Sequence, residues 1–185
     1  EEALAWFGKA ADQGNADAEF NLALAYHRGE GVEQDFDEAA NWAMKAAEKD
    51  HAKAQLLLGA MHGQGEGFTQ DHAVALSWIT KAAEQGYDHA QYVLGLMYFE
   101  GDGVIQDHAQ AAKLFLMAGN QGHAECQYRL GWMYREGSGV DQDHREAVRW
   151  YARAAEQGHP NAQFDLGAMC MDGLGISKDL PAAYK

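Results

Sequence analysis

The chain has 185 residues, of which 47% are hydrophobic, and it carries a formal net charge of −14. The acidic excess argues against a nucleic-acid partner and against an anionic membrane surface, because both bind proteins largely through Lys and Arg. No apolar run approaches the roughly 20 residues needed to span a bilayer. With 21 glycines and only two prolines, the composition favours helices joined by glycine turns.

The two ends of the chain carry no targeting signal. It starts at Glu1 without an initiator Met or signal peptide, and it ends at Lys185 in the middle of a repeating pattern. We therefore expect it to be a piece of a longer protein, so cytoplasmic, periplasmic and secreted locations all stay open. Its two cysteines, Cys126 and Cys170, lie among apolar residues and are expected to be buried free thiols.

A loop sequence recurs with a strict period of 36 residues. The copies read "RGEGVEQD" from Arg28, "QGEGFTQD" from Gln64, "EGDGVIQD" from Glu100, "EGSGVDQD" from Glu136 and "DGLGISKD" from Asp172. The same register places leucine at Leu22, Leu58, Leu94, Leu130 and Leu166, and glycine at Gly59, Gly95, Gly131 and Gly167. A period that is kept along the whole chain indicates stacked structural repeats.

In chain order, the repeats divide one continuous domain, 1–185. Residues 1–17 form the end of one unit, 18–53, 54–89, 90–125 and 126–161 form four full units, and 162–185 begin another. In the third full unit, "AQYVLGLMYFEG" from Ala90 and "HAQAAKLFLMAGNQG" from His108 both place apolar residues at helical spacing. We name these two segments helix A and helix B of the repeat, and they predict an all-α fold.

Helix ends explain the loop between helices A and B. An aspartate stands where each helix B needs an N-cap: Asp35, Asp71, Asp107, Asp143 and Asp179. Glu38, Gln110 and Glu146 follow three residues later and predict a capping box. The paired glycines suit the positive φ angles of a reversing chain. The apolar residue after them (Val32, Phe68, Val104, Val140 or Ile176) is expected to plug the loop onto the core.

The loop does not predict a phosphate site or a metal site. A phosphate-binding loop follows a strand and usually carries a Lys, whereas this one follows a helix and lacks a Lys in its first four copies. His72, His108 and His144 share one repeat position, so they should lie roughly 10 Å apart, too far to share an ion. We expect them, and likewise His51, His123 and His159, to be solvated. No catalytic set of side chains can be nominated, and no cofactor is expected.

These features resemble the Sel1-like repeat family, a relative of the tetratricopeptide repeat. The match "AxxxLGxMYxxGxGVxxDxxxAxxWxxKAAEQG" covers the whole chain, and "KAAEQG" from Lys81 and "RAAEQG" from Arg153 carry it best. The resemblance implies a right-handed α/α superhelical solenoid with helices A on a concave inner face. It also implies a non-catalytic protein–protein interaction scaffold or adaptor, here expected to be part of a larger bacterial protein.

Two alternatives stay open. One is a secreted ligand-binding or β-lactamase-like enzyme of the cysteine-rich branch of the family, although this chain lacks the paired cysteines of that branch. The other is a structural spacer that packs against the rest of its own chain. Half-units at the ends expose apolar faces, which also predicts end-to-end self-association.

Helical phase selects a set of candidate partner-binding residues on the concave face: Phe20, Leu24, Tyr92, Leu96, Phe99, Tyr128, Trp132, Arg135 and Phe164. The Phe and Tyr positions could instead form core between units. Aromatic and apolar residues beside an Arg are typical anchors for a protein or peptide. The many acidic residues would steer a basic partner toward this face, or they would simply keep the solenoid soluble.

Overall fold

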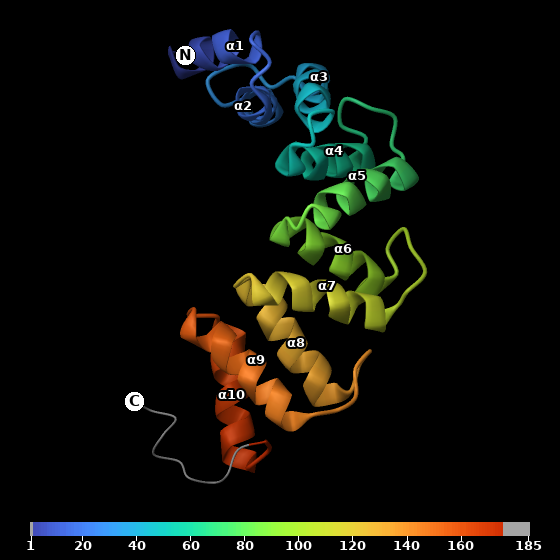
Figure 1. Ribbon diagram of the computed structural model, residues 1–185, viewed down its shortest axis with the longest axis vertical. Coiled ribbons are helices and arrows are strands. Elements are labelled where there is room, and N and C mark those ends of the chain that lie inside the picture. Colours follow the sequence, from blue (N-terminus) through green and yellow to red (C-terminus); the bar gives the residue numbers. More distant parts are fainter. Residues whose placement is uncertain (1, 176–185) are drawn as a thin grey trace. The chain divides into compact units, whose positions relative to one another are not determined.

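Residues 2–175, which the computed structural model describes, form ten α-helices (Figure 1). The helices are α1 (Glu2–Ala11), α2 (Ala16–Arg28), α3 (Phe36–Ala47), α4 (Ala52–Gln64), α5 (His72–Glu84), α6 (Asp88–Glu100), α7 (His108–Asn120), α8 (Ala124–Glu136), α9 (His144–Glu156) and α10 (Pro160–Asp172). Even-numbered helices are the predicted helices A, and odd-numbered helices are the predicted helices B. The predicted all-α repeat fold is confirmed.

The chain divides into two compact units, Glu1–Ala90 and Gln91–Lys185. In unit 1, each of α1, α2, α3 and α4 packs against the helix that follows it in the sequence. In unit 2, α7, α8 and α9 do the same. Each unit is therefore a series of helix pairs stacked as in a solenoid. None of the helices in residues 2–175 is long and apolar enough to cross a membrane.

Small residues let the helices of a pair approach closely. Unit 1 has an alanine-rich core that includes Ala43, Ala46 and Leu58, while unit 2 is built around larger side chains such as Phe115 and Tyr151. The recurring glycine of helix A lies against the large residue of helix B in the same repeat. An added methyl group at Gly131, for example, would come within 2.4 Å of the Tyr151 ring.

The predicted ends of the loop are confirmed in the described repeats. In the loop between α8 and α9, Gly137 and Gly139 have φ angles of 71° and 72°, and Gly137 caps α8. Asp143 caps α9: its Oδ1 accepts hydrogen bonds from the amides of Glu146, at 3.1 Å, and Arg145, at 2.8 Å. These amides lower the pKa of the Asp143 carboxyl. Asp179 and Ile176 lie outside the described residues.

The prediction that the N-cap amide of helix B donates to the side chain three residues later, which is the second half of a capping box, is wrong. A capping box would leave the N-cap amide to the side chain three residues later. Instead, the amide of Asp143 donates to the Tyr134 carbonyl oxygen at 2.9 Å, and that of Asp35 donates to Tyr26 at 3.0 Å. This bond ties the start of helix B to the last turn of helix A, so the loop is closed by backbone and does not need Glu38 or Glu146.

The apolar plug and the thiols follow the expectation in part. Phe68 packs against the core of unit 1 and Val140 packs against the core of unit 2. Cys126 is buried and Cys170 is half-buried, and both are free thiols.

Candidate protein-interaction surface

The candidate partner-binding residues all lie on helices A. Phe20 and Leu24 lie on α2 in unit 1. The others belong to unit 2, with Tyr92, Leu96 and Phe99 on α6, Tyr128, Trp132 and Arg135 on α8, and Phe164 on α10. All are half-buried except Phe164, which is 77% exposed.

The Phe and Tyr rings lie against the histidine that caps the next helix A in the sequence. The ring centroids are 4.8 Å apart for Phe20 and His51, and 4.7 Å apart for Tyr128 and His159. Tyr92 stacks on His123 in the same way, at 4.9 Å. Each of these rings therefore takes part in packing between successive repeats while keeping part of its surface exposed.

The histidines in these stacks are N-caps of helices A. Nδ1 of His159 accepts the backbone hydrogen bond from Ala162 at 3.2 Å, which places the ring proton on Nε2. Nε2 then donates to Glu125 of the preceding repeat, at 2.9 Å. His51 makes the equivalent bonds to Ala54 and Asp17, both at 3.1 Å.

The expectation that these imidazoles are solvated is wrong, since the side chains of His51 and His159 are only 14% and 12% exposed. A signal for the capping role was present in the sequence. Asn15, an ordinary N-cap residue, occupies the same repeat position and accepts from the Ala18 amide at 2.9 Å.

His159→Ala is expected to lower the free energy of unfolding by about 1–2 kcal/mol through the lost cap. His159→Asn should recover most of that loss, because Asn15 performs the same capping in the first repeat. Urea unfolding followed by circular dichroism would measure both variants. Equal losses for Ala and Asn would contradict the capping role and leave the stack on Tyr128 and the hydrogen bond to Glu125 as the contributions of His159.

A second aromatic group joins α6, α7 and α8 in unit 2. Phe99 stacks on His108 at 4.8 Å and meets Trp132 edge-on at 5.6 Å. His108 Nδ1 lies 2.7 Å from the Ser138 hydroxyl of the next loop. His108 is thus half-buried between repeats, contrary to expectation, as is His144, whereas His72 is exposed as expected. Leu96, Phe99 and Trp132 also pack against the core of this unit.

A charged and phenolic group adjoins these rings. Arg135 pairs with Glu136 at 2.8 Å and with Asp165 of α10 at 3.1 Å, and Tyr128 hydrogen-bonds Asp165. Burial alone would lower the pKa of Arg135, but its bond to Glu136 and the nearby acids raise it. Burial, and then Asp165, raise the pKa of Tyr128. Arg135 therefore keeps its positive charge, and the carboxylates of Glu136 and Asp165 balance it.

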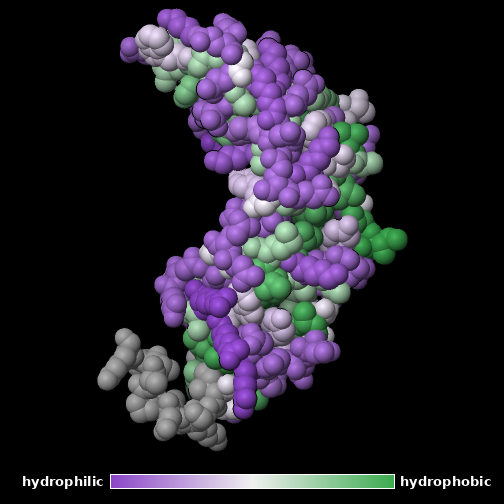
Figure 2. Space-filling view, viewed as in Figure 1, coloured by the Kyte–Doolittle hydropathy of each residue, from purple (hydrophilic) through white to green (hydrophobic). Residues whose placement is uncertain are grey.

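The exposed apolar residues of unit 2 lie mostly elsewhere. Figure 2 shows hydrophobic side chains at the surface over α6 and α7, bordered by hydrophilic ones. Ile105, in the loop between these helices, is 91% exposed, and Met117 on α7 is 48% exposed. Sequence reasoning did not place either among the candidates, because helical phase says little about a loop position or an outer helix face.

The acidic and imidazole groups of the described part of the chain do not gather into an ion site. Within residues 2–175, no group of three or more His, Cys, Asp or Glu side chains could hold a metal ion. Most of the histidines described above are instead engaged in caps and stacks between repeats.

The family model for the Sel1 repeat matches residues 1–15, 16–51, 52–87, 88–123, 124–159 and 160–185, which together cover the whole chain. The chain belongs to the Sel1 repeat family. A comparison of the sequence with curated proteins found no match.

Solved structures of bacterial proteins are similar to this Sel1 repeat protein. A protective antigen from uropathogenic Escherichia coli, c5321, is 39% identical with a TM-score of 0.91, over 98% of this chain and 39% of its own. A Sel1 repeat protein from Oxalobacter formigenes is 32% identical with a TM-score of 0.89, over 99% of this chain and 75% of its own. The Pseudomonas aeruginosa immunity protein Pa5087 is 26% identical with a TM-score of 0.59, over 97% of this chain and 64% of its own.

Proposed function

We propose that this Sel1 repeat protein is a non-catalytic interaction module that binds a segment of another protein on the α6–α8 surface. The observation that carries the proposal is the group formed by Leu96, Phe99, Trp132 and Arg135, whose side chains are partly exposed on two successive helices A. Aromatic and Arg side chains dominate the binding energy of protein interfaces. Repeats of this type typically mediate protein interactions.

The charges around this group favour a basic segment. Arg135 is balanced by Glu136 and Asp165, and Glu100 and Asp102 are exposed at the end of α6 and in the loop after it. The local surface is therefore net acidic, in line with the charge of −14 on the whole chain. A segment with Lys or Arg next to an apolar residue would satisfy both the carboxylates and the rings, and its association would weaken as salt rises.

The non-catalytic part of the proposal rests on what the candidate acid–base groups already do. Nδ1 of His51, His123 and His159 accepts a backbone amide, and His108 meets Ser138 under a Phe ring. An imidazole whose Nδ1 accepts the cap hydrogen bond cannot take up a proton at Nδ1 without breaking the cap. These histidines stabilise the packing between successive repeats.

Alanine substitution would be a poor test of the surface, since Phe99 and Trp132 also support the core of unit 2. A photoreactive diazirine analogue of leucine at position 96 changes the packing little, and the same analogue at position 116 is a matched control. Leu96 lies on helix A, whereas Leu116 lies on helix B and is 37% exposed.

We expect ultraviolet cross-linking from position 96 to a library of short peptides to select basic peptides with an apolar residue, and to fade at high salt. The probe at position 116 should give at most background. Equal yields from both positions, or a selection of acidic peptides at position 96, would contradict the proposal. Circular dichroism would confirm that both labelled proteins are equally helical.

A further inference from the structure

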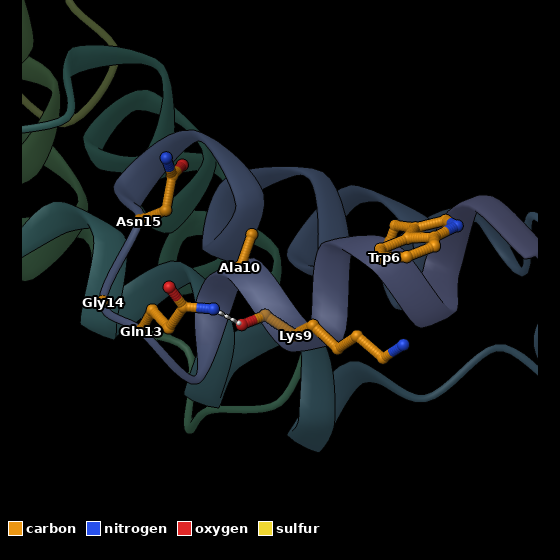
Figure 3. Close-up of a pocket in the computed structure, with 6 residues that line it drawn as sticks. All are labelled: Trp6, Lys9, Ala10, Gln13, Gly14 and Asn15. Carbon is orange, nitrogen blue, oxygen red and sulfur yellow. Dashed lines mark hydrogen bonds between the residues drawn. The ribbon is translucent and has the colours of Figure 1, made fainter.

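Helix α7 breaks a pattern that the other described helices B share on their exposed surface. In each of the others, a tryptophan is followed three residues later by a Lys or Arg that lies over its ring. Lys9 Nζ, for example, lies 4.2 Å from the centroid of the Trp6 ring (Figure 3), and the distances in α3, α5 and α9 are 3.7, 4.2 and 4.5 Å. In α7 these two positions hold Leu114 and Met117. An apolar side chain therefore stands where the same fold elsewhere carries a charge.

Two more positions of this repeat lose charge or polarity. Asn120 takes the place of Glu48, Glu84 and Glu156, and α7 is the only helix B within residues 2–175 that contains no Asp or Glu. Ile105, in the loop that leads into α7, takes the place of Glu, Thr or Asp in the loops of the other described repeats, and it is 91% exposed. Since the fold accepts polar residues at these positions, its packing does not require the apolar ones.

The exposed residues of α7 form a stripe along the helix. They recur at helical spacing: Ala109, Lys113, Leu116, Met117 and Asn120. Leu116 is 37% exposed and Met117 is 48% exposed. The hydrophobic surface over α6 and α7 is visible in Figure 2, with hydrophilic residues around it. Apolar side chains that gather at the surface mark an interaction site when the fold does not need them.

Two unpaired charges of opposite sign accompany the stripe. Lys113 is the only Lys, Arg, Asp or Glu of α7, and its ammonium group has no ion pair or hydrogen bond among residues 2–175. Asp102 lies in the same loop as Ile105, and its carboxylate is exposed and likewise unpaired within the described residues. A surface that carries an apolar stripe, a cation and a carboxylate can be complementary to a copy of itself.

We propose that α7 forms the two-fold contact of a homodimer, in which the α7 helices of two copies pack antiparallel. In such an interface, if one residue contacts a second, that second residue contacts the first across the axis. Ile105 of one copy then packs against Met117 of the other. The midpoint of these two positions in the sequence is also the midpoint of Ala109 and Lys113 and that of Asp102 and Asn120. One axis therefore aligns all three pairs to within a helical turn.

This register accounts for the residues that distinguish α7. The two most exposed apolar side chains of the surface, Ile105 and Met117, cover each other. The Asn120 amide can donate to the Asp102 carboxylate of the other copy, whereas the Glu of the other repeats would repel it. Lys113 lies over the small Ala109 of the other copy and supplies positive charge at the centre of the contact.

The net charge of the chain explains why this face suits a second copy. Each copy carries a charge of −14, so two copies repel each other, and they can approach most closely through a helix B that has no acidic residue. Salt screens the repulsion, and association should therefore strengthen as salt rises. That response is opposite to the one expected for a basic segment on the α6–α8 surface, so the two proposals can fail separately.

Ile105→Thr with Met117→Lys tests the contact in the complete chain. Thr69 and Lys81 hold these positions in another repeat, so the double variant should keep the melting temperature of the parent. Sedimentation velocity of the parent should show a dimer of the 20.3 kDa chain as concentration rises. We expect the dissociation constant of the double variant to be at least tenfold higher.

Met171→Lys is the matched control. It makes the same exchange on α10, where Met171 is 81% exposed, and it should leave the dissociation constant of the dimer unchanged. Either exchange also lowers the net negative charge, so general repulsion cannot explain a weaker dimer. A parent that stays monomeric, a double variant that dimerises like the parent, or equal weakening by Met171→Lys would overturn the proposal.

Disulfide trapping tests the register. Ile105→Cys and Met117→Cys, mixed and mildly oxidised, should give a cross-linked dimer. Each variant oxidised alone should give only the yield of the parent, because the axis places the two copies of either position on opposite sides. The parent measures the background from its own thiols, Cys126 and Cys170. Cross-linking of a single variant at the yield of the mixture, or a mixture at the background yield, would overturn this arrangement.

Discussion

Gly131→Ala is expected to lower the free energy of unfolding by about 1–3 kcal/mol, the usual cost of an added methyl group in a tightly packed core. The new Cβ would lie 2.4 Å from one ring atom of Tyr151 and within 2.8 Å of two others. Tyr151 is fully buried between α8 and its neighbours, so the ring cannot swing into solvent. Relief would require α8 and α9 to separate, which would loosen the whole repeat.

The chain offers a matched control at the same repeat position. Gly167 also lies inside a helix A, but no heavy atom lies within 4 Å of the Cβ that alanine would add. Gly167→Ala should therefore raise the free energy of unfolding by up to about 1 kcal/mol, because alanine favours the helix. Urea unfolding of both variants would measure the contrast. A loss at Gly167 equal to that at Gly131 would mean that the ring contact does not limit this position.

The glycines illustrate how much the period alone could predict. It identified Gly59, Gly95 and Gly131 as one structural position, and the helices, the αL turns and the Asp N-caps followed from local chemistry. It did not show which side chain each glycine faces. The nearest side chain is the Tyr151 ring at Gly131 and Ile79 at Gly59. A repeat pattern states which residues share a position, and it leaves open which side chains meet.

The histidines show the same limit at the candidate site. His159 touches Tyr128 and Glu125, which are 31 and 34 positions earlier, slightly less than one period. Such contacts depend on how far one helix pair is offset from the next, and the hydrophobic pattern does not determine that offset. The phase of Asn15 carried an unused signal for the capping role of these histidines and none for the stack. For the same reason, helical phase placed Leu96, Phe99 and Trp132 on one surface without showing that they also support the core.

Gly139→Ala is expected to be more damaging than Gly131→Ala. Gly139 has a φ angle of 72°, a left-handed conformation that costs other residues about 1–2 kcal/mol. An added Cβ would also lie 2.3 Å from the backbone C and O of His108, at the start of α7 in the preceding repeat. Overpacking adds about 1–3 kcal/mol. We therefore expect a loss of about 2–5 kcal/mol in the free energy of unfolding.

Gly158→Ala separates the two causes within the same unit. Gly158 has a φ angle of 85°, but no heavy atom lies within 4 Å of its added Cβ, so only the conformational cost of about 1–2 kcal/mol should appear. The excess loss at Gly139 then measures the contact between its loop and α7. Equal losses in the free energy of unfolding for Gly139→Ala and Gly158→Ala, measured with urea, would show that the loop can shift to relieve its contact with α7. A clearly larger loss at Gly139 would mean that the second glycine of each loop permits close contact between repeats. The turn itself requires only a positive φ angle at this position.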